Sequence, residues 1–107
     1  MTTDIFGDKI NHELKTDPYV FQRLWDKKKK FEIRFDDRDY KENDVLWLKE
    51  TKYTGAEMKA GAPLEYTGRA MSMRVTDVLR GPIYGLMDGW VILSVERISL
   101  DIPINPY

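Results

Sequence analysis

The sequence contains no cysteine, which excludes a disulfide framework and any zinc site built on thiolates. Its apolar runs are too short to cross a bilayer, as at residues 90–93. Neither sign of charge prevails. The formal net charge of -1 gives no general attraction to nucleic acid, so such binding would need a local basic patch. Residues 1–9 lack the apolar segment of a signal peptide, and we expect a cytoplasmic protein with no membrane partner.

What is present fits one small folded domain. The chain has 107 residues, of which 42% are hydrophobic and 33% charged, a composition typical of globular proteins. Three Trp, six Tyr and four Phe can fill a modest core with few side chains. Residues 1–9 show no periodicity and are expected to form a tail. Residues 10–107 are expected to form a single domain that is a monomer.

One helix is predicted to start after Asp17. The Asp17 side chain can accept hydrogen bonds from the first free N–H groups of a helix. Pro18 suits the first helical position, because no N–H is needed there. Val20 and Leu24 then recur at helical spacing, and the lysine run at residues 27–30 ends the helix in water.

Alternating segments predict the strands. Residues 31–35 alternate, with apolar side chains on one face and with Glu32 and Arg34 on the other. Further strands are expected at residues 10–15, 45–50, 70–79, 90–96 and 98–104, the last as an edge strand or extended arm because it contains Pro103. Residues 51–63 are expected to be a long hairpin loop. About five or six strands with one main helix predict a mainly β fold, a small β-barrel.

Four charged residues form the most informative cluster: Lys29, Glu32, Arg34 and Arg38. Glu32 and Arg34 project from one face of a strand, with Cβ atoms roughly 6–7 Å apart. Such a set can hold a phosphate or the polar edge of a base. Lys29 and Glu32 can also serve as general acid and base if burial shifts their pKa values. A half-solvated strand face beside a wet lysine run would produce the same pattern.

The same segment resembles the ASCH superfamily, whose hallmark is Gly-x-Lys-x-x-Glu-x-Arg. Lys29, Glu32 and Arg34 fill the Lys, Glu and Arg places, whereas Lys27 stands in the Gly place and leaves the turn geometry open. Within the superfamily, the chain is similar to a family of small proteins of unknown function, frequent in phages and prophages. The similarity covers roughly residues 10–97 and also rests on His12-Glu13-Leu14-Lys15-Thr16, Asp37-Arg38, Tyr66-Thr67-Gly68-Arg69 and Tyr84-Gly85-Leu86.

The resemblance implies a PUA-like barrel with a cleft beside the helix, and RNA or a modified nucleoside or nucleotide as partner. One branch contains small amidohydrolases that act on N4-acetylcytidine, in which the motif Lys is catalytic. That branch carries Thr where this chain has Glu32, so that only Lys29 carries over directly. Three functions stay open: a binding protein that uses Lys29, Glu32 and Arg34, an enzyme that uses Lys29 and Glu32, and a phage-type module that binds a host protein.

Two further residues complete the candidate ligand-binding set. His12 is the only histidine, and it either lines the cleft or forms a hydrogen bond in the core. Tyr19, beside the predicted helix start, is the aromatic ring best placed to stack on a base. One histidine with scattered carboxylates does not make a metal site, and we expect neither a metal nor a cofactor.

Overall fold

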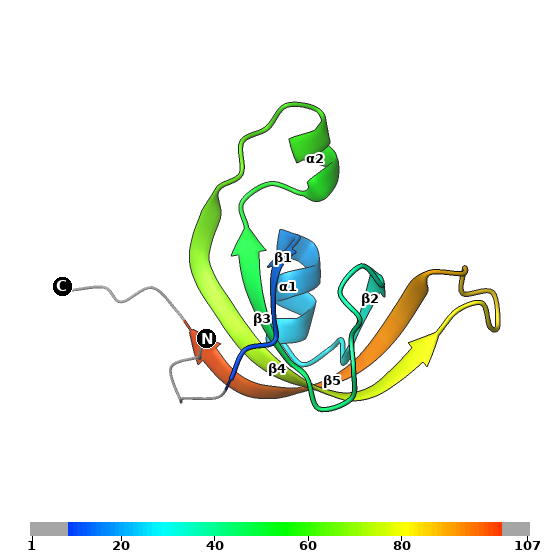
Figure 1. Ribbon diagram of the computed structural model, residues 1–107. Helices are drawn as coiled ribbons and strands as arrows, with labels where there is room; N and C mark the ends of the chain where they lie inside the picture. Colours follow the sequence, from blue (N-terminus) through cyan, green and yellow to red (C-terminus); the bar gives the residue numbers. More distant parts are fainter. Residues whose placement is uncertain (1–8, 102–107) are drawn as a thin grey trace.

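The computed structural model describes residues 9–101 and has a mainly β fold (Figure 1). The strands are β1 (His12–Thr16), β2 (Phe31–Phe35), β3 (Val45–Thr51), β4 (Tyr66–Arg80) and β5 (Trp90–Asp101), and the helices are α1 (Pro18–Trp25) and α2 (Gly55–Lys59). The predicted fold class, mainly β with about five strands and one main helix, is confirmed. The predicted tail, apart from Lys9, and the predicted arm beyond residue 101 lie outside the described residues.

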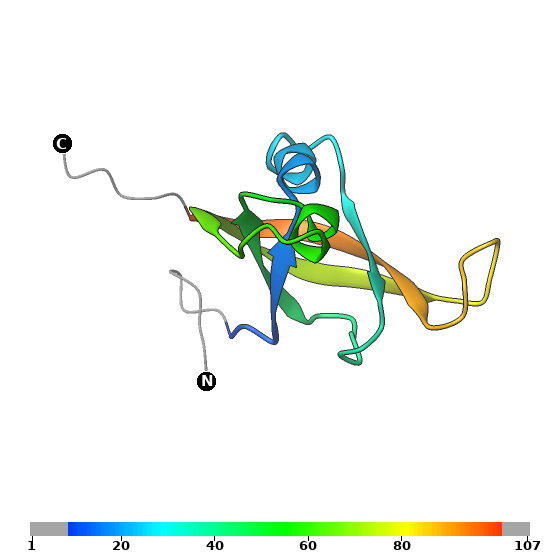
Figure 2. The same ribbon diagram turned by 90° about the horizontal axis from the view of Figure 1, so that it is seen from above.

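The strands form one sheet in the order β1-β3-β4-β5-β2, so that β1 and β2 are its edges. β1 runs parallel to β3, and the other pairs are antiparallel. Register shifts after Ser72 and Val75 break the β4–β5 ladder, and such bulges bend a strand. The sheet accordingly curls around α1 (Figure 1), while the loop between β4 and β5 projects from the body (Figure 2).

The core fills the space between α1 and the sheet. Phe21 and Leu24 are the buried residues of α1, and their spacing puts both on one face of the helix. The sheet and the loop before β3 contribute the rest of the cluster: Leu14, Tyr40, Leu46, Leu48, Met71, Met73, Val75, Val91, Leu93 and Val95. Full burial of one such side chain stabilises the fold by roughly 1.5–3 kcal/mol, so Phe21 and Leu24 anchor the helix firmly.

The start of α1 corrects one prediction. Pro18 occupies the first turn as expected, but the Asp17 side chain accepts no hydrogen bond from the N–H groups of α1. Its Oδ1 accepts instead from the backbone N–H of Gly55, at 3.0 Å. A partner distant in the sequence competes successfully with the local cap. Asp17 therefore ties the start of α1 to α2.

The turn after α1 contains Lys27, the residue in the glycine place of the motif. The N–H of Lys28 donates to the carbonyl of Arg23 at 3.0 Å, and that of Lys27 donates to Leu24 at 3.1 Å. This pair of bonds is the Schellman motif, which requires a left-handed residue just after the helix. Lys27 supplies it, with φ of 60°. The backbone therefore takes the conformation for which glycine is best suited, although the residue is lysine.

Two other segments differ from the sequence prediction. Residues 51–63 are not a plain hairpin loop, because they contain α2. Thr54 and Glu57 form a capping box, in which each side chain accepts from the other's backbone N–H at 3.0 Å. The strands predicted at 90–96 and 98–104 are one strand, β5, as far as it is described. Beyond Val95 it pairs with β4 alone.

A buried ion pair fixes α1 to the sheet. Glu50 on β3 is 5% exposed and accepts from Arg69 on β4 at 2.9 and 2.8 Å, and from the hydroxyl of Thr67 at 2.6 Å. Arg69 also donates to Gln22 on α1, and its guanidinium lies 4.7 Å from the ring centroid of Trp25. Burial raises the pKa of Glu50, but the hydrogen bonds and the charge of Arg69 outweigh it and lower the pKa below its ordinary value.

Lys27→Gly is expected to stabilise the protein by about 1 kcal/mol or less, because glycine enters the left-handed region without the steric cost of a Cβ. Lys28→Gly removes the same charge from the same helix end, but it is expected to destabilise by about 0.4–1 kcal/mol, because glycine gives the unfolded chain more conformational freedom. The difference between the free energies of unfolding of the two variants in urea measures the effect of the backbone conformation, because both variants lose the same charge. A Lys27→Gly variant less stable than the wild type would contradict the left-handed turn.

Glu50→Gln is expected to make the free energy of unfolding fall less steeply as the pH is lowered. Because the folded-state pKa of Glu50 lies below the unfolded value, its carboxylate stabilises the fold above the unfolded pKa. That contribution is lost as the pH falls through the folded pKa. Urea unfolding between about pH 6 and about pH 3 measures the difference. Glu65→Gln, in an exposed pair with Lys52, should follow the wild-type curve, and the idea fails if Glu50→Gln follows it too.

Candidate functional site

The charged face of β2 points toward the core side of the sheet. In the ladder with β5, Glu32 lies opposite Leu93 and Arg34 opposite Val91, and both partners are buried. Residues that face each other across a ladder lie on the same side of the sheet. The alternation predicted for β2 is therefore present, but its apolar side chains are the exposed ones. Their exposed fractions are Phe31 44%, Ile33 47% and Phe35 55%.

Glu32 is the centre of the site. The residue is only 2% exposed, and its Oε2 accepts from Nε of Arg34 at 2.9 Å. Its other oxygen, Oε1, is buried and has no hydrogen-bond partner among residues 9–101. A buried acceptor without a donor costs about 1–3 kcal/mol, and more for a charged group. One oxygen of the Glu32 carboxylate therefore still needs a hydrogen-bond donor.

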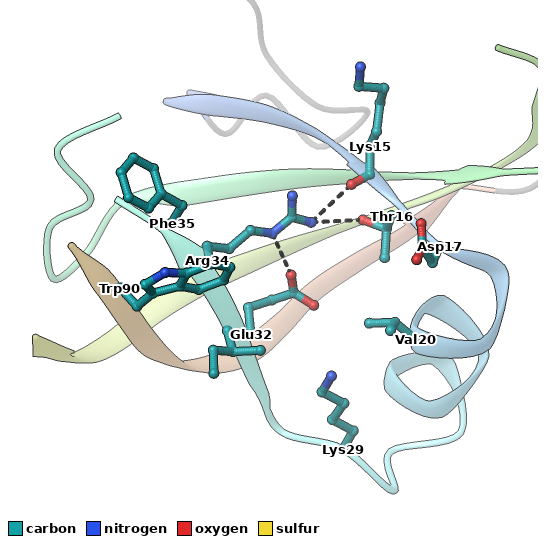
Figure 3. A pocket seen from close by; sticks show the side chains of 10 residues that line it. Lys15, Thr16, Asp17, Val20, Lys29, Glu32, Arg34, Phe35 and Trp90 are labelled. Carbon is teal, nitrogen blue, oxygen red and sulfur yellow. Dashed lines mark hydrogen bonds and ion pairs between the residues drawn. The ribbon is translucent and has the colours of Figure 1, made fainter. Parts of the chain in front are cut away.

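Arg34 connects Glu32 with the opposite edge of the sheet. Its Nη2 donates to the carbonyl of Lys15 at 3.0 Å and to the hydroxyl of Thr16 at 3.4 Å (Figure 3). Arg38, in the loop after β2, likewise donates to the carbonyl of Glu13 at 3.0 Å. In the described sheet β1 and β2 are not neighbours, so these side chains bridge the two edges.

The first cavity brings together the trio that the sequence singled out. It has a volume of about 290 Å³, and Lys29, Glu32 and Arg34 all line it (Figure 3). Its remaining lining residues are Lys15, Thr16, Asp17, Val20, Ile33, Phe35 and Trp90. Apolar walls with a few convergent polar groups are typical of small-molecule sites, and this volume lies at the small end of their range.

A second cavity of about 630 Å³ adjoins the first, and Arg34, Lys15, Asp17 and Phe35 line both. Its other lining residues are Leu14, Asp37, Arg38, Tyr40, Gly55, Met58 and Lys59, so that α2 forms one wall. Burial raises the pKa of the Tyr40 hydroxyl, while the nearby charges of Arg34 and Arg38 act in the opposite direction. Arg38, predicted as a ligand-binding residue, thus lies in this second cavity.

Two predicted site residues lie elsewhere. His12 shares a hydrogen bond with Oδ2 of Asp44 at 2.7 Å, and its ring packs against Tyr40 at 4.7 Å between centroids. Tyr19 is 73% exposed, with Arg23 beside its ring. Neither lines either cavity. Within residues 9–101, no three histidines and carboxylates gather into a metal-binding cluster, and no helix has the length and apolarity needed to cross a membrane.

Several residues that line the cavities were not predicted. From the sequence, Lys15 and Trp90 are expected only within strands and Asp17 at the start of the helix, and Thr16 has no predicted place in the site. The capping box of α2 was a usable signal for the wall that carries Lys59. No local signal reveals the others, because they reach the site through the pairing of β1 with β3 and of β2 with β5.

Arg34→Ala is expected to destabilise the protein by about 3 kcal/mol, because it leaves the buried Glu32 carboxylate unpaired. Glu32→Gln added to Arg34→Ala should recover at least about 1 kcal/mol, since the remaining group is then neutral. Arg38→Ala also removes a bond to β1 but keeps Glu32 paired, and it should cost only about 1 kcal/mol. Chemical unfolding of the four proteins measures this, and equal losses for both arginines would contradict the assignment.

Comparison with known proteins places the chain in a family. Residues 11–95 match a family described as a domain of unknown function, DUF3850. No curated protein matches the chain. The matched segment contains every residue that lines the two cavities, from Leu14 to Trp90. The chain therefore belongs to the DUF3850 family.

Proposed function

We propose that this protein binds RNA or a modified nucleotide in its first cavity, and that it is a PUA-like domain of the ASCH superfamily. The observation that carries the proposal is the buried Oε1 of Glu32, which lines a cavity and lacks a donor within residues 9–101. The exocyclic amino group of a base supplies such a donor. Specific RNA recognition commonly inserts an unstacked base into a pocket and reads its edge through hydrogen bonds.

The rest of the cavity suits the other features of a base. Lys29 lines it from the opposite side to Arg34 in Figure 3. Its ammonium lies 4.9 Å from the ring centroid of Phe31 and forms no ion pair with any described residue. Lys29 is therefore available to donate to a base oxygen. Phe35 and Trp90, with ring centroids 5.9 Å apart, give an aromatic wall. Aromatic side chains favour flat ligands, because a base has a π-face that packs on them.

The superfamily assignment has support from the motif. Lys29, Glu32 and Arg34, which fill three of its places, line one cavity. Lys27, in the glycine place, has the left-handed backbone that glycine adopts readily. The curled five-stranded sheet with a helix inside it is compatible with a PUA-like barrel. The family match alone assigns no function.

An NMR titration of labelled protein with cytidine, N4-acetylcytidine and a short RNA tests the proposal. Shifts are expected to cluster at Lys29, Glu32 and Arg34. Glu32→Gln, which puts an amide in place of the carboxylate, is expected to weaken binding about tenfold or more, the loss of roughly one charge-assisted hydrogen bond. Glu65→Gln is the matched control and should bind like the wild type. Tight binding that is unaffected by Glu32→Gln and Lys29→Ala would contradict the proposal that the ligand binds in the first cavity.

An amidohydrolase on N4-acylated cytidine is the second candidate, favoured because Lys29 and Glu32 line the same cavity. Water would add to the acyl carbon and the C–N bond would break, giving cytidine and acetate. Glu32 would accept a proton from water and return it to the leaving amino group, and Lys29 would activate the attacking water. The same titration reports it: acetate must appear with the wild type and not with Lys29→Ala. Absence of acetate leaves a binding protein, and absence of all shifts favours a protein partner.

A further inference from the structure

The second cavity is lined by four cationic side chains, one more than the first. Its lining cations are Lys15, Arg34, Arg38 and Lys59, of which Arg34 is already paired with Glu32, and its lining carboxylates are Asp17 and Asp37. Asp17 accepts from the backbone N–H of Gly55, a neutral donor that leaves its negative charge in place. The Asp37 side chain is 63% exposed and lies 3.9 Å from Arg38, a geometry too open to neutralise it. Three cations, Lys15, Arg38 and Lys59, therefore stand against two carboxylates, and the cavity keeps a small excess of positive charge.

Much of this positive charge is available to a ligand. The ammonium groups of Lys15 and Lys59 form no ion pair within residues 9–101. Arg38 uses Nη1 to donate to the carbonyl of Glu13, and a guanidinium has further N–H groups to offer. Tyr40 also lines the cavity, but it is buried, and the carboxylates of Asp36 and Asp37 act on its hydroxyl as well as Arg34 and Arg38.

Arg34 lines both cavities, and the two cavities require opposite kinds of group from a ligand. The first holds a buried acceptor without a donor, at Oε1 of Glu32. The second holds donors and cations in excess of acceptors. A free nucleoside can donate a hydrogen bond to Glu32 in the first cavity, but it leaves the cations of the second cavity in contact with water. A ligand that joins an amino-bearing base to an anionic group satisfies both.

We infer that the second cavity is a phosphate subsite, so that the ligand is a phosphate-bearing nucleotide and not a free nucleoside. This inference rests on the proposed function for the base half of the site. Lys59, on α2, would meet the phosphate from one side, and Arg38 and Lys15 would meet it from the edges of the sheet. The phosphate belongs either to a mononucleotide or to an RNA strand, and the chemistry of recognition is shared.

Isothermal titration of cytidine and of cytidine 5′-monophosphate into the wild type tests the subsite. The wild type is expected to bind the monophosphate about tenfold more tightly than cytidine at low salt, an advantage that falls as salt is added. Lys59→Glu should bring the monophosphate down to the affinity of cytidine while cytidine binding stays the same. Lys41→Glu makes the same charge change outside both cavities and should keep the preference.

Two outcomes overturn the inference: equal affinity of the wild type for both ligands, or a preference that survives Lys59→Glu. Inorganic phosphate, followed by NMR, separates this failure from failure of the proposed function. If phosphate shifts the amides of Lys15, Arg38 and Lys59 but cytidine does not bind, the base site fails and the anion subsite stands. If cytidine binds and phosphate causes no shifts, the subsite fails and the base site stands.

A third ligand distinguishes the source of the phosphate. The dinucleotide cytidylyl-cytidine carries a diester where the monophosphate has a terminal group. Tighter binding of the dinucleotide identifies a strand of RNA as the ligand, because the second nucleotide then adds contacts. Weaker binding identifies a mononucleotide, whose terminal phosphate carries more charge. Either result supports the subsite, provided that Lys59→Glu weakens the preferred ligand.

Discussion

The Arg34 guanidinium is the interaction on which the rest of the site depends. It pairs with the buried Glu32 on its own strand, and it donates to the carbonyl of Lys15 and the hydroxyl of Thr16 on the far edge of the sheet. One side chain thus orients the carboxylate, bridges the two edges of the curled sheet and lines both cavities. The rigid, many-donor geometry of a guanidinium allows these tasks together, whereas an ammonium group would offer neither its reach nor its fork.

A buried ion pair of this kind is weak support for stability. Taking two charges out of water costs several kcal/mol per ion, and the attraction repays this only where the remaining lone pairs are also satisfied. Glu50 meets that condition, because Arg69 and Thr67 occupy its oxygens. Glu32 does not meet it, because Oε1 has no partner within residues 9–101. The contrast between two carboxylates of one small domain supports the proposal that Glu32 meets a ligand, whereas Glu50 is fully used within the fold.

The sequence allowed the strands, the main helix and the Lys29–Glu32–Arg34 cluster to be predicted, because local periodicity carries that information. It did not allow the faces to be assigned. Alternation in β2 separates two sides without telling which is inside, and the ladder with Leu93 and Val91 decides it. The prediction that Asp17 caps the helix was wrong for a related reason, because its actual partner, the N–H of Gly55, lies far along the chain. The positions of His12 and Tyr19 likewise follow from packing that no local pattern encodes.

The exposed apolar side of β2 has a consequence for how this chain folds. A slip of one residue in its pairing with β5 would turn Phe31, Ile33 and Phe35 inward and would place Glu32 and Arg34 in water. By hydrophobic transfer alone that slipped register is the better one, so the strand is locally frustrated in the native fold. Arg34 and its acceptors on β1 counter the slip, because these hydrogen bonds require Arg34 to lie on the inner side of the sheet. Selection for a purely more stable chain would therefore tend to erase the site.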